Sequence, residues 1–262
     1  MEDLCDLLFE VSNEDRLKLI RVLRGRDQNV TGLARDLGIT TQEVSRHLSR
    51  LGDVGLTEKD PDGSYRLTPY GELILKQIKG VEFTSGHRDY FIDRSLRGLP
   101  EEFVNRLGEL SRSDYMDDIM VVVHNVERVI READEYLWDL NLPYIASAFP
   151  EIRRAFERGV KGRFIHGENL SLPEEMEDDR RETLDYDFTT SMMRAGVYQE
   201  RLIDTSPIIY MSEREVALVT FPRRDGRHDF YGFTSTDEAT LKWCSDLFLY
   251  HWERSKPLNK SS

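Results

Sequence analysis

The chain has 262 residues, of which 49 are acidic and 36 basic, so its formal net charge is −13. It contains no run of about 18 apolar residues, which argues against a transmembrane helix, and its first residues lack the basic start of a signal peptide. Two widely separated cysteines, Cys5 and Cys244, offer no disulfide framework. We therefore expect a cytoplasmic protein with reduced thiols and two modest domains.

Two short helices are predicted before residue 39. The first begins after Ser12–Asp15, where an N-cap and two acidic residues precede an apolar stripe, and the second ends at Gly38. The positions expected to be buried are Leu17, Ile20 and Leu23 in the first helix and Leu33, Ala34 and Leu37 in the second.

The next helical pattern carries the strongest functional signal. Thr40 or Thr41 supplies its N-cap, and Val44, Leu48 and Leu51 recur at i, i+4 and i+7 as one buried stripe. The other side presents short hydrogen-bonding groups and two guanidinium groups, which suit base edges and phosphates in a major groove. The residues predicted to face outward are Gln42, Ser45, Arg46, Ser49 and Arg50.

A β-hairpin is predicted directly after this helix. The turn residues Asp60–Gly63 separate LTEK from SYRL, and Lys59 and Arg66 add positive charge to the two strands. Thr68–Pro69 then forms a cap with proline at the first helical position. Helices followed by a hairpin predict a winged helix-turn-helix over residues 1–80.

The string EVSRHLSRLGDVGL resembles the recognition helix and wing entry of winged-helix regulators of the ArsR and MarR kind. This resemblance implies DNA contacts at Ser45, Arg46 and Arg50. His47 either reaches a phosphate or packs against the wing, and we favour packing. ArsR metal sensors carry a cysteine pair here and this chain does not, so we expect no metal site. The predicted DNA-binding residues are Thr40, Thr41, Gln42, Ser45, Arg46, Ser49, Arg50, Lys59 and Arg66.

The charge is unevenly distributed along the chain. Residues 1–80 hold 12 basic and 14 acidic residues, so most of the acidity lies beyond them. Arginine outnumbers lysine 28 to 8, and with the acidic excess this resembles a protein of a salt-loving archaeon. Concentrated salt shortens the Debye length to about 3 Å and weakens the contribution of counterion release. An ordinary mesophile with an acidic effector domain is the alternative.

A composition shift at residues 81–98 predicts the end of a connecting helix and a linker, and residues 99–262 are expected to form an effector domain. Strand-like and helical runs alternate there, so the expected fold class is a multidomain α/β protein whose C-terminal part is an α/β sandwich-type domain. The predicted strands are 135–142, 160–166, 197–203, 208–211, 216–221 and 230–234; the predicted helices begin at 99 and span 119–133, 149–158 and 236–252.

Two strings in this region resemble known archaeal effector domains. YFIDRSLRGLPEEFVNRLGELSRSDYM is similar to the start of the effector domain in methanogenesis-regulator-like transcription factors, and EIRRAFERGVKGRFI is similar to a segment of the sugar-responsive TrmB regulators. The resemblance implies a fold related to phospholipase D. That chemistry needs a His-x-Lys pair, yet no histidine of this chain has lysine two places later. We therefore expect a binding domain, not an enzyme, and no cofactor.

The favoured interpretation is an archaeal DNA-binding transcriptional regulator that forms a homodimer and senses a small molecule or another signal through its C-terminal domain. A winged-helix module for protein contacts is the alternative, and an enzyme acting through the second domain is the third possibility. No membrane partner is expected. Candidate ligand-binding residues, chosen because they lie at strand ends or are aromatic, are Trp138, Tyr144, His166, Glu168 and Tyr198.

Overall fold

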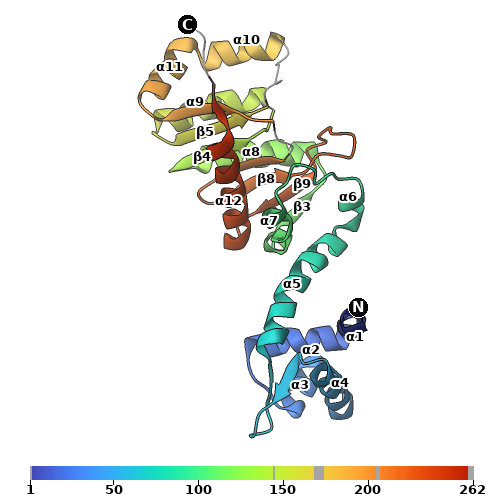
Figure 1. Cartoon of the computed structure of the whole chain (residues 1–262). Helices are drawn as coiled ribbons and strands as arrows, with labels where there is room; N and C mark the ends of the chain where they lie inside the picture. Colours follow the sequence, from blue (N-terminus) through green and yellow to red (C-terminus); the bar gives the residue numbers. More distant parts are fainter. Residues whose placement is uncertain (1, 144, 168–173, 205–206, 259–262) are drawn as a thin grey trace. The chain divides into compact units, whose positions relative to one another are not determined.

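The computed structural model describes residues 2–143, 145–167, 174–204 and 207–258 (Figure 1). The chain divides into two compact units, Met1–Val81 and Glu82–Ser262. Each unit has its own apolar core. The predicted α/β fold class with an N-terminal winged helix-turn-helix is confirmed. In the part of the chain that is described, no helix is both long and apolar enough to cross a membrane.

From residue 2 onward, the first unit contains four helices, a two-stranded hairpin and most of a fifth helix. Side chains cap three of the helices: Asn13, Asn29 and Thr40 each accept a hydrogen bond from a backbone N–H in the first turn. The elements are α1 (Glu2–Val11), α2 (Glu14–Gly25), α3 (Val30–Leu37), α4 (Thr41–Asp53), β1 (Thr57–Lys59), β2 (Tyr65–Leu67) and α5 (Pro69–Gly86).

The core of this unit lies where α2, α3 and α4 pack together. Leu19, Leu33, Val44 and Leu51 are fully buried in it, and burial of each such side chain contributes about 1.5–3 kcal/mol. Helix α3 ends at Gly38, whose φ of 69° is left-handed and therefore suits a residue without a side chain. The shared core and the left-handed conformation of Gly38 together produce the tight turn between α3 and α4.

The hairpin forms as predicted, with Thr57 opposite Leu67 and Lys59 opposite Tyr65. Its turn is closed by hydrogen bonds from the Gly63 N–H to the Asp60 carbonyl and from the Asp60 N–H to the Ser64 carbonyl. The backbones of Gln28 and Tyr65 exchange two hydrogen bonds of 3.1 and 2.8 Å. These bonds attach the wing to the segment that precedes α3.

The segment 81–98 was predicted to contain a linker, but its residues from Glu82 onward are part of the compact second unit. It holds the last residues of α5 and the short helix α6 (Arg88–Ile92). Phe83 and Tyr90 are buried in the core of that unit, where the rings of both lie 5.1 Å from that of Phe233. The mixed polarity of the segment suggested a linker, but its aromatic residues bury a large apolar area.

Among its described residues, the second unit is built around one mixed sheet of eight strands in the order β10-β6-β5-β4-β7-β8-β9-β3. Strands β4, β5 and β6 are parallel neighbours, and all other neighbours are antiparallel. The strands are β3 (Asp114–Met116), β4 (Tyr136–Leu140), β5 (Lys161–His166), β6 (Tyr198–Leu202), β7 (Ile208–Ser212), β8 (Val216–Thr220), β9 (Gly232–Ser235) and β10 (Lys256–Pro257).

Helices cover both faces of this sheet (Figure 1). One face packs against α8 and α9, where Val126, Ile152 and Phe164 share a core. The other packs against α12 and α7, where Trp243 and Phe103 are buried. The helices are α7 (Glu101–Val104), η1 (Leu107–Leu110), α8 (Ile119–Glu132), η2 (Ala146–Ala148), α9 (Phe149–Glu157), α10 (Glu174–Thr183), α11 (Tyr186–Arg194) and α12 (Glu238–Arg254).

Candidate nucleic-acid interface

Helix α4 presents a polar stripe on the side opposite its buried residues. At about 100° per residue, Gln42, Arg46 and Ser49 fall within about 60° of one another, roughly opposite Val44 and Leu51. The three polar side chains are exposed, whereas the two apolar ones are fully buried. The helix therefore offers a continuous hydrogen-bonding surface to solvent without giving up any core contact.

The start of α4 is fixed by a capping box. The Thr40 hydroxyl accepts a hydrogen bond from the Glu43 N–H and donates one to the Glu43 carboxylate, which also accepts from the Thr40 N–H at 2.9 Å. The bond from the Thr40 backbone lowers the pKa of Glu43. Farther along, the Ser45 hydroxyl donates to the Thr41 carbonyl at 2.8 Å. The hydroxyls of Thr40 and Ser45 thus already have partners within the helix.

The two arginines of the polar side differ in their surroundings. Arg46 is exposed and has neither an ion pair nor a hydrogen bond among the described residues. Arg50 binds the Glu10 carboxylate through Nη2 at 2.8 Å and Nε at 3.1 Å, and its guanidinium lies 5.3 Å from the centre of the Phe9 ring. The hydrogen bond to Glu10 raises the pKa of Arg50. Arg46 is available to a ligand, whereas Arg50 attaches α4 to α1.

Glu10 holds a second arginine on its other side. Arg16 Nε lies 3.0 Å from the Glu10 carboxylate, and the Arg16 guanidinium also donates to the carbonyls of Glu10 and Phe9 at 2.6 and 3.0 Å. The Arg16 and Glu10 side chains are only 6% and 11% exposed, and burial lowers the pKa of Arg16. One carboxylate therefore joins α1, α2 and α4.

We expect Glu10→Gln to destabilise the first unit by about 3 kcal/mol, because it leaves the buried Arg16 charge without a counter-charge. Arg50→Ala should cost clearly less than Glu10→Gln, because the Arg50 side chain is 41% exposed and its ion pair is screened by solvent. Urea unfolding followed by circular dichroism measures both changes. Equal losses for the two variants would show that Arg16 does not depend on Glu10.

His47 lies inside the unit, as the packing interpretation expects. Its side chain is 6% exposed, and Nδ1 has no hydrogen-bond partner among the described residues. Burial, aided by the positive charges of Arg16 and Arg46, lowers the pKa of His47. The neutral imidazole is thus favoured, and a neutral ring inside the fold is poorly placed to bind a phosphate.

The wing carries positive charge that is partly neutralised. Lys59 is exposed and its ammonium group lies 5.6 Å from the centre of the Tyr65 ring. Arg66 donates to Glu58 at 2.7 Å and lies 3.4 Å from Asp60, and the hydrogen bond with Glu58 raises its pKa. Of the two predicted wing residues, only Lys59 therefore lacks a carboxylate partner in the described structure.

A groove between α3 and the wing tip was not predicted. It has a volume of about 590 Å³ and is lined by Arg26, Arg35 and the first turn of α3 on one side and by Asp62 and Ser64 on the other. The Gln28–Tyr65 bridge brings these segments together. A bridge between residues 37 positions apart leaves no local sequence signal. Of the residues that line the groove, two exposed arginines, Arg26 before α3 and Arg35 within it, could have been noted in the sequence.

The candidate ligand-binding residues do not form one site. Trp138 is half-buried and lines a cleft between β4 and β5. His166 and Tyr198 lie on the opposite face of the sheet, where both are buried beside Glu200. Trp138 packs with the core under α12, whereas Tyr198 packs with the core under α9. Two further candidates, Tyr144 and Glu168, lie outside the described residues.

The face that holds His166 also buries acidic groups. Burial alone would raise the pKa of Glu200, but hydrogen bonds with His166 and Tyr198 and the charge of Arg180 lower it to about 2. Asp139 on β4 has less support: burial raises its pKa to about 7, against the attraction of His166. Its carboxylate accepts one backbone hydrogen bond, from Leu142 at 2.9 Å. Among the described residues, no group of three or more His, Cys, Asp or Glu side chains is arranged to hold a metal ion.

Comparisons with known proteins give a family model that matches the N-terminal part of the chain and solved structures that are similar to more of it. No curated protein matches the chain. Among solved structures, it is similar to TrmBL2, an archaeal chromatin protein (16% identity, 91% of this chain and 92% of that chain, TM-score 0.43), and to Nuc, a phospholipase D family member from Salmonella typhimurium (9%, 56% and 95%, 0.35). At these scores, neither similarity assigns a function. Residues 4–86 match the family model of the HVO_A0261 N-terminal domain, so this segment is similar to that domain.

Proposed function

We propose that the protein is a DNA-binding transcriptional regulator whose α4 enters the major groove. The observation that carries this proposal is the exposed stripe of Gln42, Arg46 and Ser49, on a helix whose other side is buried and which is followed by a wing. Amide and guanidinium groups make two-point contacts with adenine and guanine edges, respectively. Lys59 on the wing would then contact the phosphate backbone.

The same proposal includes a homodimer, because one recognition helix reads only a few base pairs and two-fold partners span two half-sites. Large apolar side chains on α1 and α5 of the first unit are exposed to solvent over about half of their surface. They are Leu4 (56% exposed), Leu8 (55%), Phe9 (61%), Tyr70 (45%) and Leu73 (53%). Exposed apolar groups gathered on two helices are typical of a surface that a partner covers.

The second unit would sense a small molecule or another signal. A ligand that binds one conformation of the dimer more tightly shifts the population toward it, and a changed spacing of the two recognition helices loses contacts at one half-site. We propose no enzymatic activity for this unit, since the chain has no His-x-Lys pair.

Arg46→Ala is expected to weaken binding to the preferred DNA sequence by about 5- to 150-fold, because a two-point contact to guanine contributes about 1–3 kcal/mol of discrimination. Binding to random DNA should fall less. Mobility-shift titrations of the chain with its own upstream DNA, repeated from low salt to molar potassium chloride, measure both affinities.

Arg194→Ala is the matched control, because it removes the same charge from an exposed position of the second unit. It should leave both affinities unchanged. An equal loss on specific and random DNA in the Arg46 variant would instead assign Arg46 to a phosphate. A wild-type chain that binds no DNA at any salt concentration would contradict the proposed function itself.

Leu8→Glu is expected to convert the proposed dimer into a monomer, because it places a charge in the apolar surface of α1 while changing no buried contact. Sedimentation equilibrium measures the mass, and circular dichroism checks that the fold is kept. Met120→Glu, at a 69% exposed position on α8, serves as the control and should leave the mass unchanged. A dimeric Leu8→Glu variant would exclude this surface.

A protein-contact module is the second candidate, and one observation favours it. Two of the predicted DNA-binding arginines, Arg50 and Arg66, are paired with carboxylates, and residues 1–80 have a net charge of −2. Such a surface attracts DNA weakly. The mobility-shift titration separates the two candidates, because a protein-contact module would show no preference for the upstream DNA.

A further inference from the structure

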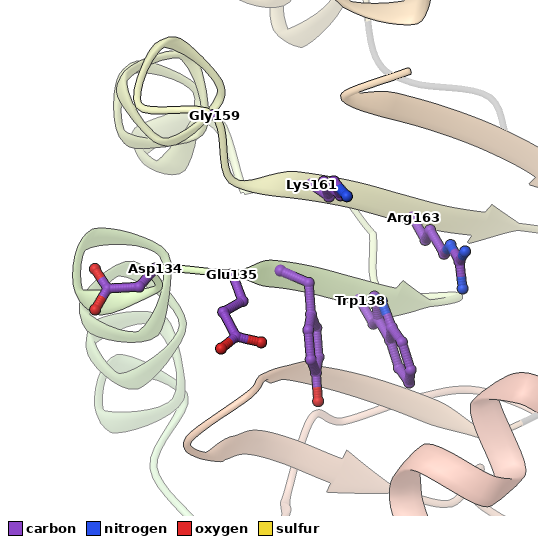
Figure 2. Close-up of a pocket in the computed structure, with 7 residues that line it drawn as sticks. Asp134, Glu135, Trp138, Gly159, Lys161 and Arg163 are labelled. Atoms are coloured by element: carbon purple, nitrogen blue, oxygen red, sulfur yellow. The ribbon is translucent and has the colours of Figure 1, made fainter. Parts of the chain in front are cut away.

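The cleft between β4 and β5 combines aromatic rings with unpaired charges on one face of the sheet (Figure 2). Its volume is about 490 Å³, within the range of small-molecule sites. The strands are parallel and their register places Tyr136 beside Lys161 and Trp138 beside Arg163. Neighbouring residues of paired strands project from the same face, and Figure 2 shows Trp138 and Arg163 doing so.

The aromatic side of the cleft is the end of a column of stacked rings. Trp138 stacks on Phe248, with ring centres 4.7 Å apart and an angle of 16° between the planes, and Phe248 stacks in turn on Trp252. Tyr136 stacks on Trp138 at 4.4 Å, and no further ring stacks on Tyr136 among the described residues. Phe248 is fully buried, so its packing in the core fixes the position of the Trp138 ring that stacks on it. A planar ligand ring would extend it by one member.

The charges around the column lack partners of their own. Lys161 and Arg163 form no ion pair with a carboxylate in the described structure; the Arg163 guanidinium lies over the rings of Trp138 and Trp252 at 5.9 and 5.2 Å. Glu135 likewise has no ion-pair partner there, whereas Asp134 pairs with Arg214. Two cations and one carboxylate without ion-pair partners among the described residues therefore line the same cleft.

We propose that this cleft binds a small aromatic amino acid. The ring would stack on Tyr136, the carboxylate would pair with Lys161 and Arg163, and the ammonium group would pair with Glu135. A zwitterion satisfies both kinds of unpaired charge, whereas a simple anion would leave Glu135 opposed to it. An aliphatic amino acid has no ring that could stack on Tyr136, so it would bind more weakly than an aromatic one. The further role of this ligand as the effector of transcription rests on the proposed function.

The test is calorimetric titration of the full-length chain, without DNA, with L-phenylalanine and three analogues that each lack one group. We expect L-phenylalanine to bind with a Kd on the order of 1 mM or below, as suits a small ligand in an open cleft. 3-Phenylpropionate lacks the ammonium group, phenethylamine lacks the carboxylate and L-alanine lacks the ring. 3-Phenylpropionate and phenethylamine should each bind at least about 10-fold more weakly, because a hydrogen bond to a charged group contributes that much. L-alanine should also bind more weakly, because it loses the stacking contact with Tyr136.

Variants then assign the binding to this cleft. Lys161→Ala should weaken L-phenylalanine binding at least about 10-fold while hardly changing phenethylamine, which has no carboxylate. Glu135→Gln should likewise weaken L-phenylalanine binding without weakening 3-phenylpropionate, which has no ammonium group. Lys76→Ala, which removes an exposed lysine of the first unit, is the control and should change neither. Both cleft variants alter exposed side chains, so unchanged thermal unfolding checks that they are folded.

The proposal is wrong if L-phenylalanine does not bind, if any of the three analogues binds more tightly than L-phenylalanine, or if binding is unaffected by both cleft variants. Because no DNA is present, a negative result leaves the DNA-binding proposal untouched. If the chain binds L-phenylalanine but no DNA, the proposed ligand site stands, and the proposed role of the ligand in transcription is wrong.

Discussion

Replacing Gly71 by alanine is expected to lower the free energy of unfolding of the first unit by about 3 kcal/mol, at the upper end of the usual cost of overpacking. Gly71 lies in the first turn of α5, where a Cβ atom would overlap the backbone carbonyl of Leu56. That carbonyl already accepts a hydrogen bond from the Thr68 N–H, and the Thr68 hydroxyl accepts one from the Gly71 N–H. Neither backbone segment can withdraw without breaking these bonds.

The measurement uses the distribution of tryptophans, since Trp138, Trp243 and Trp252 all lie in the second unit. Circular dichroism should report the early unfolding of the first unit in urea, while tryptophan fluorescence should be unchanged. Gly25→Ala is the matched control, because a Cβ there meets no atom within 4 Å at the end of α2. It should be neutral or stabilise by up to about 1 kcal/mol. Similar losses in both variants would contradict the proposed overlap.

Asp139→Asn is expected to stabilise the second unit by about 3 kcal/mol at pH 8 and to have little effect at pH 4. Burial raises the pKa of Asp139 to about 7 in the folded chain, against about 3.9 when unfolded. The folded state therefore binds more protons between these values, so stability is full below about pH 4 and is lost as the pH rises through about 7. The shift corresponds to about 4 kcal/mol at most.

Asparagine keeps the shape of the protonated carboxyl and its bond from the Leu142 N–H without ionising. Urea unfolding followed by tryptophan fluorescence, at several pH values, gives the difference between variant and wild type. Asp187→Asn, at an exposed position of α11, is the control and should show no such dependence. A difference that stays constant from pH 4 to 8 would show that Asp139 is ionised throughout.

Local signals predicted the first unit closely. The N-cap at Thr40, the helix end at Gly38 and the turn at Asp60–Gly63 each depend on only a few neighbouring residues. Local sequence patterns are therefore sufficient to locate α3, α4 and the wing. In the second unit the strands rich in β-branched and aromatic residues were also predicted. Strand β3 was not, because it has only three residues and pairs with β9, which lies over a hundred residues away.

The candidate site was predictable only in part. Which side of α4 faces outward follows from helical period, but the partner of Arg50 does not, because Glu10 is 40 residues away on another helix. The pairing changes the proposed role of Arg50 from reading DNA to positioning α4. The separation of Trp138 from His166 depends on the register of β4 and β5, which only the structure supplies.

The ion pairs on the wing have a consequence for how affinity responds to the ionic medium. To reach a phosphate, Arg66 would leave Glu58 and Asp60, and those carboxylates would then recruit potassium or sodium ions from solution. DNA meanwhile releases the ions condensed on its own strands. Uptake and release oppose each other, so the occupancy of an operator would decline only gently as the medium becomes more concentrated.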